Sequence, residues 1–218
     1  MKQLIIIITG LILLMTACVD NTVYFDQPQP EGLSDLKQLP IRYRGQYMDQ
    51  DSTLLTITET LVIMKTNYEI VIKKSEIDSS KEFKFENNKL INILTNSQVV
   101  YRIKNDTFYI KENNIDTLFN LSNTNIARKY KGYLILNTKW DNSWSAECFS
   151  LTNGTLKQIQ IESKELFNKL SAIYENEIIM DSTQTDTIKM ILKPTKKQFK
   201  QILNIEDSLV INEYKKIK

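Results

Sequence analysis

Most of this chain consists of short segments rich in Ile, Val, Thr, Tyr and Phe, a composition that predicts β-strands. Asn87-Asn88 and Asn113-Asn114 separate some of these segments with side chains that tolerate the backbone angles of turns. Eight short strands at this spacing favour an antiparallel meander, a sandwich or an open barrel. The candidates are Thr53–Thr58, Leu61–Met64, Tyr68–Lys73, Glu82–Phe85, Lys89–Leu94, Val99–Ile103, Thr107–Lys111 and Asp116–Leu121.

A second β-rich region begins near Ile126. Asn153-Gly154 predicts a tight hairpin turn, because both residue types accept the positive φ that a type I′ turn requires. The segment Trp140 to Trp144 predicts a three-residue hairpin loop that sets the two indoles opposite each other. The strands expected here are Lys131–Trp140, Cys148–Leu151, Thr155–Ile161, Thr187–Leu192 and Ser208–Ile217.

Two helices are expected among these later strands. Ser163 suits an N-cap, and the apolar residues behind it follow helical spacing over 163–174. Thr195 and Gln198 fit a capping box, which predicts a helix over 195–204. The expected fold class is therefore mainly β with an α+β C-terminal part.

The N-terminal segment indicates export. A positive start at Lys2 precedes an apolar run, and Leu4–Ala17 as a helix would reach only about 21 Å, short of the ~30 Å hydrocarbon core. This length is typical of a signal peptide over 1–17 rather than of a permanent membrane span.

The end of that segment, Leu14-Met-Thr-Ala-Cys18, resembles the lipobox of bacterial lipoproteins, with Met15 in place of the usual Leu. The resemblance implies cleavage before Cys18 and acylation of its thiol and amino end, which anchors the chain stably in a membrane. Because Val19 follows the cysteine, the Asp that marks inner-membrane retention in some bacteria is missing, and an outer-membrane location is expected. An ordinary signal peptide with Cys18 as a structural thiol is the alternative.

The expected domain organisation has three parts after the signal peptide. Residues 18–40 contain three prolines and form a tether, although Val23–Phe25 could instead add an edge strand. A β-rich unit follows over 41–125, and a second β-rich unit with the two helices covers 126–218.

Composition argues against several classes of function. The chain has no histidine, which excludes His-based triads, His proton shuttles and His-ligated metals. A net charge of +2 argues against nucleic acid as a partner. Cys148 alternates with Trp144 and Ala146 and is interpreted as a buried apolar residue. We therefore expect no cofactor, no metal site and no enzymatic activity.

Three surface features are candidate sites. Trp140, Trp144 and Tyr133 could form an aromatic platform for sugar, or pack the hairpin. Lys193, Lys196, Lys197 and Lys200 could touch anionic headgroups, or form an ordinary solvated face. Asp followed by Ser or Thr is similar to the O-glycosylation motif of exported Bacteroidota-type proteins, but such pairs also open turns. The hydroxyls concerned belong to Ser52, Thr117, Ser182, Thr187 and Ser208.

The lipobox, the prolines after it and the ending Lys193-Pro-Thr-Lys-Lys-Gln-Phe-Lys-Gln-Ile202 together resemble small Bacteroidota-type lipoproteins that have no assigned activity. The resemblance implies location and shape but no reaction. The leading hypothesis is an envelope lipoprotein that binds a partner protein or a glycan through its β surface. The alternatives are a lipocalin-like carrier of an apolar ligand and, less favoured, a hydrolase that uses carboxylates or a Ser-Lys pair.

Overall fold

The computed structural model of the chain describes residues 21–161, 169–170, 179–181, 188–205 and 210–218. These residues confirm a mainly β fold with a helix near the C-terminus. The helix is α3 (Lys196–Leu203), and two 3-10 helices are η1 (Ile41–Tyr43) and η2 (Lys74–Ser79). The strands are β1 (Asn21–Phe25), β2 (Gly45–Met48), β3 (Leu54–Ile57), β4 (Leu61–Lys73), β5 (Phe83–Glu86), β6 (Lys89–Asn92), β7 (Ser97–Gln98), β8 (Tyr101–Lys104), β9 (Thr107–Asn120), β10 (Asn125–Tyr130), β11 (Tyr133–Trp140), β12 (Ser143–Thr152), β13 (Thr155–Gln160), β14 (Ile179–Asp181), β15 (Ile188–Leu192) and β16 (Val210–Lys216).

Most strands belong to one mixed sheet of 13 strands. Its main path runs β14-β15-β1-β12-β13-β16-β2-β3-β4-β9-β8, and β11 pairs with both β10 and β12. The pair of β1 and β15 is parallel, whereas the other described pairs are antiparallel. A separate small sheet contains β5, β6 and β7.

The strands β11, β12 and β13 form the centre of a body that is packed on both faces. Side chains alternate between the two sides of a strand, so neighbouring residues enter different cores. Cys148 lies on one side, which we call the Cys148 face, together with core residues of β1, β15 and α3. Glu147 lies on the other side, the Glu147 face, where Leu134 and Phe149 pack against residues of β2, β3, β4 and β9.

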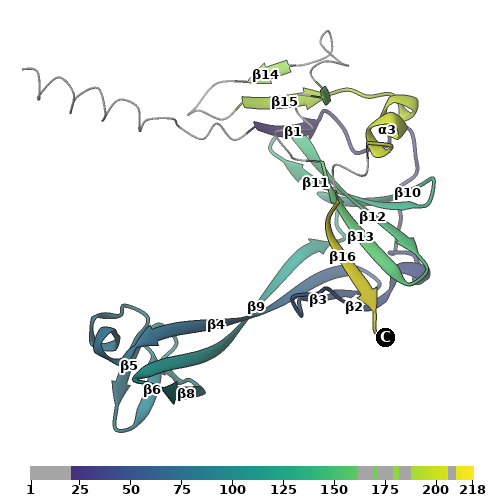
Figure 1. Cartoon of the computed structure of the whole chain (residues 1–218). Helices are drawn as coiled ribbons and strands as arrows, with labels where there is room; N and C mark the ends of the chain where they lie inside the picture. The colour runs from purple at the N-terminus through teal and green to yellow at the C-terminus, as the bar shows by residue number, and fades with distance from the viewer. Residues whose placement is uncertain (1–20, 162–168, 171–178, 182–187, 206–209) are drawn as a thin grey trace, which may run out of the picture.

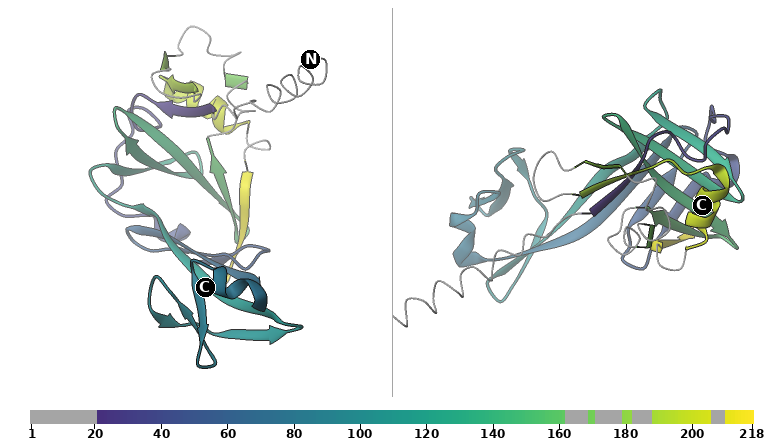
Figure 2. Two further views of the ribbon diagram at one scale, coloured as in Figure 1. Left: turned by 90° about the vertical axis from the view of Figure 1, so that its left-hand side faces the viewer. Right: turned by 90° about the horizontal axis from the view of Figure 1, so that it is seen from above.

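An arm extends from this body, as Figures 1 and 2 show. The strands β4 and β9 stay paired from Leu61–Asn120 to Lys73–Thr107, well beyond the last β3 partner at Lys65. At the far end, β8, η2 and the small sheet complete a lobe. Within its core, the aromatic rings of Phe85, Tyr101 and Phe108 contact one another, with centroids 5.1–5.9 Å apart.

The prediction of a tether over 18–40 is wrong from Asn21 onward, because the chain is part of the body there. The alternative strand at Val23–Phe25 is confirmed as part of β1, although it lies between β15 and β12 instead of at an edge. The segment that follows is also fastened to the body, because Asn137 hydrogen-bonds both backbone groups of the buried Gln29. Apolar burial and these hydrogen bonds outweigh the extended tendency of the prolines.

The sequence predicts a boundary between two β-rich units at residue 125, but the body is continuous across this position. The strand β16 joins the two parts by pairing with β13 on one side and β2 on the other. One core also contains Tyr43 and Tyr47 from the earlier part with Leu134 and Tyr214 from the later part. The arm is the part that stands away from this shared core (Figure 1).

Turn signals within the two β regions have mixed outcomes. Asn153 and Gly154 form the expected hairpin turn, with φ of +50° and +77°. The prediction of a turn at Asn113-Asn114 is wrong, because both residues pair inside β9 and merge two expected strands into one. The ribbon is open to solvent there, so asparagine side chains fit its surface.

The outcomes for the helices and the indole hairpin also differ. The helix α3 has the expected capping box of Thr195 and Gln198. The helix expected over 163–174 lies outside the described residues except at 169–170. The hairpin after β11 has a two-residue turn, since Trp140 pairs with Ser143 and Trp144 pairs with Lys139. The indoles therefore project to opposite faces, which corrects the expected arrangement.

Candidate functional site: the Trp140 groove

A polar groove crosses the Glu147 face of the central strands. Apart from Ala146, the lining residues of β11, β12 and β13 lie two positions apart along their strands and therefore share one side of the sheet. Register places Thr138 opposite Ser145, and Glu147 opposite Gln160. The groove, which we call the Trp140 groove, has a volume of about 350 Å³, within the range of small-ligand sites. It is lined by Leu118, Leu136, Thr138, Trp140, Ser145, Ala146, Glu147, Gln158 and Gln160.

The groove opens where the packing against the Glu147 face ends. Farther along the same strands, Leu134 and Phe149 are fully buried under the first β strands of the chain. Leu118 forms the rim, and from there β9 continues into the arm. The indole of Trp140 is 58% exposed at the other end, close to the hairpin turn. The sheet thus presents a large aromatic surface beside polar groups instead of burying it.

A hydrogen-bond network holds the floor of the groove. Gln158 is 7% exposed, and its Nε2 donates to Oε1 of Glu147. Its own Oε1 accepts from the Tyr214 hydroxyl at 2.9 Å and from Asn212 Nδ2 at 3.2 Å. Both ends of the Gln158 amide are therefore engaged, and the amide can hold the Glu147 carboxylate in a defined position.

Burial of the tyrosine beneath this network changes its acidity. Burial raises the pKa of Tyr214 to about 12, and the nearby Asp49 charge adds to the effect. The hydroxyl therefore stays protonated at physiological pH and remains a hydrogen-bond donor to Gln158.

The three aromatic residues expected to form a platform are not brought together. Tyr133 and Trp144 lie on the Cys148 face, where both pack against its core. They are at opposite ends of that face, since Tyr133 pairs with Ser150 while Trp144 pairs with Lys139. Of the three, Trp140 alone reaches the groove.

The sequence analysis does not identify the polar residues that line the groove beside Trp140. Glu147, Gln158 and Gln160 stand in strands whose alternation was visible, but the alternation does not say which strands are neighbours. The sequence does contain a signal for them. Residues that can contact a polar ligand recur at two-residue spacing in three segments: Thr138-Lys-Trp140, Ser145-Ala-Glu147 and Gln158-Ile-Gln160.

The proposed modification sites are only partly described. Ser52 is exposed in a turn with φ of +63°, where Asp49 Oδ1 accepts from the backbone amides of Asp51 and Thr53. Thr117 is exposed within β9, opposite Ile63. Cys18, Ser182, Thr187 and Ser208 lie outside the described residues.

Cys148 does not line the Trp140 groove. Cys148 is fully buried in the apolar core, as expected from its alternation with Trp144.

The described residues contain no group of three or more acidic or thiol side chains placed to hold a metal ion. Within the same residues, no helix combines the length and apolar character needed to cross a bilayer.

Other hollows lie on the arm. One lies on the arm ribbon between Tyr68 and Glu112, and another lies at the arm tip beside Lys73 and Asp106. The Trp140 groove differs because the strands that position its side chains belong to the packed body, where core residues on both faces hold them in place.

Comparisons with protein-family models, with curated proteins and with solved structures find no match to this chain.

Proposed function

We propose that this chain is a lipid-anchored protein of the cell envelope that binds carbohydrate in the Trp140 groove. The observation that carries the binding part is the exposed indole of Trp140 beside amide, carboxylate and hydroxyl side chains on one rigid face. The anchoring part rests on the lipobox-like sequence that ends at Cys18.

The chemistry of the groove suits a sugar. One side of a pyranose ring presents C–H groups, which pack against an indole, while its hydroxyls need donors and acceptors. Thr138 and Ser145 supply hydroxyls, and Gln160 supplies an amide at the exposed edge. Glu147 adds a carboxylate that Gln158 orients, so the groove combines an apolar platform with a few convergent polar groups.

The alternatives receive less support from these residues. A carrier of an apolar ligand would need a largely apolar cavity, whereas Thr138, Glu147, Gln158 and Gln160 make about half of this lining polar. A hydrolase that works through paired carboxylates would need a second acidic group near Glu147, and the lining of this groove contains one carboxylate.

Binding can be tested with residues 18–218 carrying Cys18→Ser, which retain every described element of the fold. The chain is titrated with neutral, N-acetylated and acidic oligosaccharides, and binding is followed by calorimetry. Trp140→Ala should weaken binding at least about tenfold, because it removes the stacking surface. Gln160→Ala should also weaken it.

The matched control is Trp144→Phe, which changes the indole on the opposite face of the same hairpin. It should leave the affinity unchanged. Absence of saturable binding to every oligosaccharide would contradict the carbohydrate part of the proposal, as would equal losses in the Trp140 and Trp144 variants.

The anchor is tested separately in cells. A clickable palmitate analogue should label the wild-type chain and fail to label Cys18→Ala. Labelling that persists in the variant would place the lipid elsewhere or remove the anchor from the proposal, without affecting the result for the groove.

A further inference from the structure

Four exposed lysines lie on α3 and just before it. Lys193 follows the end of β15, while Lys196, Lys197 and Lys200 lie on the solvent side of the helix. The opposite side of α3 is fixed in the core by Phe199, Ile202 and Leu203. None of the four lysines forms an ion pair with a carboxylate in the described part of the chain. We call this set the α3 lysine surface.

Helix stability does not account for Lys196 and Lys197, whereas Lys200 lies in the last turn, where positive charge favours the helix. Two lysines occupy the first turn of α3, and no acidic residue is there to offset them. Positive charge at a helix N-terminus opposes the helix dipole and costs a little stability. The helix begins instead with the capping box of Thr195 and Gln198, which would work equally well with neutral residues beside it.

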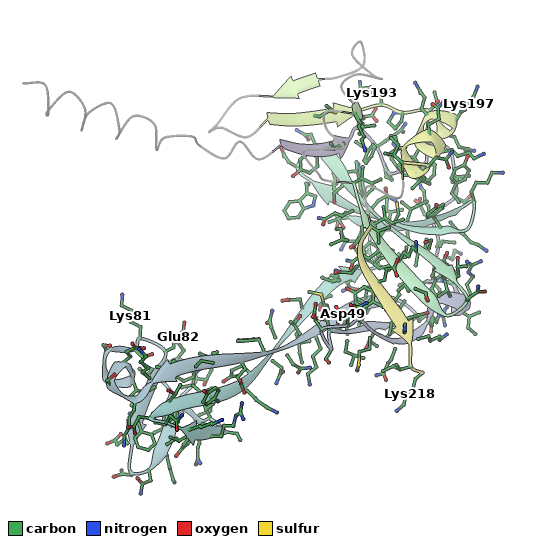
Figure 3. All side chains as sticks on the ribbon, viewed as in Figure 1. Asp49, Lys81, Glu82, Lys193, Lys197 and Lys218 are labelled. Atoms are coloured by element: carbon green, nitrogen blue, oxygen red, sulfur yellow. The ribbon has the colours of Figure 1, made fainter. Side chains whose placement is uncertain are left out.

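The α3 lysine surface lies at the same end of the body as β1. The ring centroids of Phe25 in β1 and Phe199 in α3 are 5.7 Å apart, and Leu192 of β15 accepts a hydrogen bond from the backbone of Asp26. Figures 1 and 2 show β1, β15 and α3 together at this end, away from the arm. Lys193 and Lys197 point outward there (Figure 3).

The chain between the lipidation site and β1 is too short to act as a spacer. Asn21 begins β1 only three residues after Cys18, a distance of about 10 Å even when the chain is fully extended. An acylated Cys18 would therefore hold β1 close to the headgroups. An electrostatic contact between lysines at this end of the body and an anionic membrane acts over about one Debye length, which is about 10 Å at 0.1 M salt.

We propose that the α3 lysine surface docks on anionic lipid headgroups and fixes the orientation of the body on the membrane. This inference rests on the lipid anchor of the proposed function. A single lipid attachment allows the body to tumble, and a second electrostatic contact restricts it. Because α3 packs on the Cys148 face, docking leaves the Trp140 groove on the opposite face of β11, β12 and β13 directed away from the bilayer.

The test uses residues 18–218 with Cys18→Ser, so that only the protein surface can bind lipid. Sedimentation with vesicles of equal parts phosphatidylglycerol and phosphatidylcholine is compared with pure phosphatidylcholine vesicles. The unacylated chain should partition onto the anionic vesicles and be released at high salt. Lys193→Gln combined with Lys197→Gln should lower the partition coefficient about 25-fold, since each lysine near the surface contributes about fivefold.

The matched control removes two lysines from the arm lobe, Lys81→Gln with Lys104→Gln. Lys81 lies far from α3 in Figure 3, and Lys104 belongs to β8, which lies on the arm in Figure 1. It should retain binding. Equal losses in the two double variants, or no preference for anionic vesicles, would overturn the inference. Binding to a soluble anionic polysaccharide in preference to vesicles would assign the surface to another polyanion and would also overturn it. These outcomes are independent of palmitate labelling at Cys18, which reports the anchor itself.

Discussion

The hydroxyl of Tyr214 donates a 2.9 Å hydrogen bond to the side-chain oxygen of Gln158. Tyr214 is fully buried in the core that joins the early and late parts of the chain, whereas Gln158 lines the groove. One side-chain contact thus connects the packing of the body to the floor of the candidate site.

This contact predicts a loss of stability at alkaline pH. Because burial raises the pKa of Tyr214 from about 10 in the unfolded chain to about 12, the folded state holds its proton where the unfolded state releases it. Its contribution is complete below pH ~10 and is lost as the pH rises to ~12, a change of about 3 kcal/mol. Denaturant unfolding monitored across this range should show the decline.

The variant Tyr214→Phe should make that decline shallower, since the titrating group is gone. Part of the slope should remain, because burial also raises the pKa of Tyr43 and Tyr47. Tyr68→Phe, at a position 48% exposed, is the control and should follow the wild-type curve. A Tyr214→Phe curve that coincides with the wild type would contradict the prediction.

The two tryptophans should differ strongly in their contribution to stability. Trp140→Ala should change the free energy of unfolding by less than ~1 kcal/mol, since the indole is mostly in solvent. Trp144→Ala should cost about 2–3 kcal/mol, because its ring packs on the Cys148-face core near Phe25. Chemical denaturation of the two variants measures the difference, and similar losses would refute the assignment of faces.

Gly45 should tolerate no side chain. Its φ is +139°, and a Cβ there would lie 2.3 Å from the carbonyl oxygen of Lys218. We expect Gly45→Ala to destabilise the protein by about 2–3 kcal/mol through strain and displacement of the C-terminal residues. Gly154→Ala has a positive φ but open space around it, so about 1 kcal/mol is expected. Thermal unfolding of both variants should give this order.

The Asp-Ser/Thr motifs predict added mass on the native protein. Ser52 and Thr117 are both exposed and accessible to a modifying enzyme. Intact mass spectrometry should detect a mass above that of the polypeptide, and Ser52→Ala and Thr117→Val should each remove one glycan. An unmodified mass for the wild-type protein would leave these motifs with a structural role alone.

Local chemistry by itself determined several elements of this fold. Asn153-Gly154 forms its hairpin turn and Thr195 with Gln198 begins α3, because positive φ and capping depend on neighbouring residues. The alternation around Cys148 likewise identified one buried face, since side-chain direction in a strand has a period of two.

Tertiary structure alone decided how these elements combine. The parallel pairing of β1 with β15 joins residues about 170 positions apart, and the pairing of β16 with β2 closes one sheet across the expected boundary. Alternation predicts that a strand has two faces but not which strand lies beside it or what covers each face. Which strands become neighbours depends on competition among all strands for the same sheet edges. The outcome of this competition places Trp140 in a groove with Glu147 and Gln160 instead of opposite Trp144.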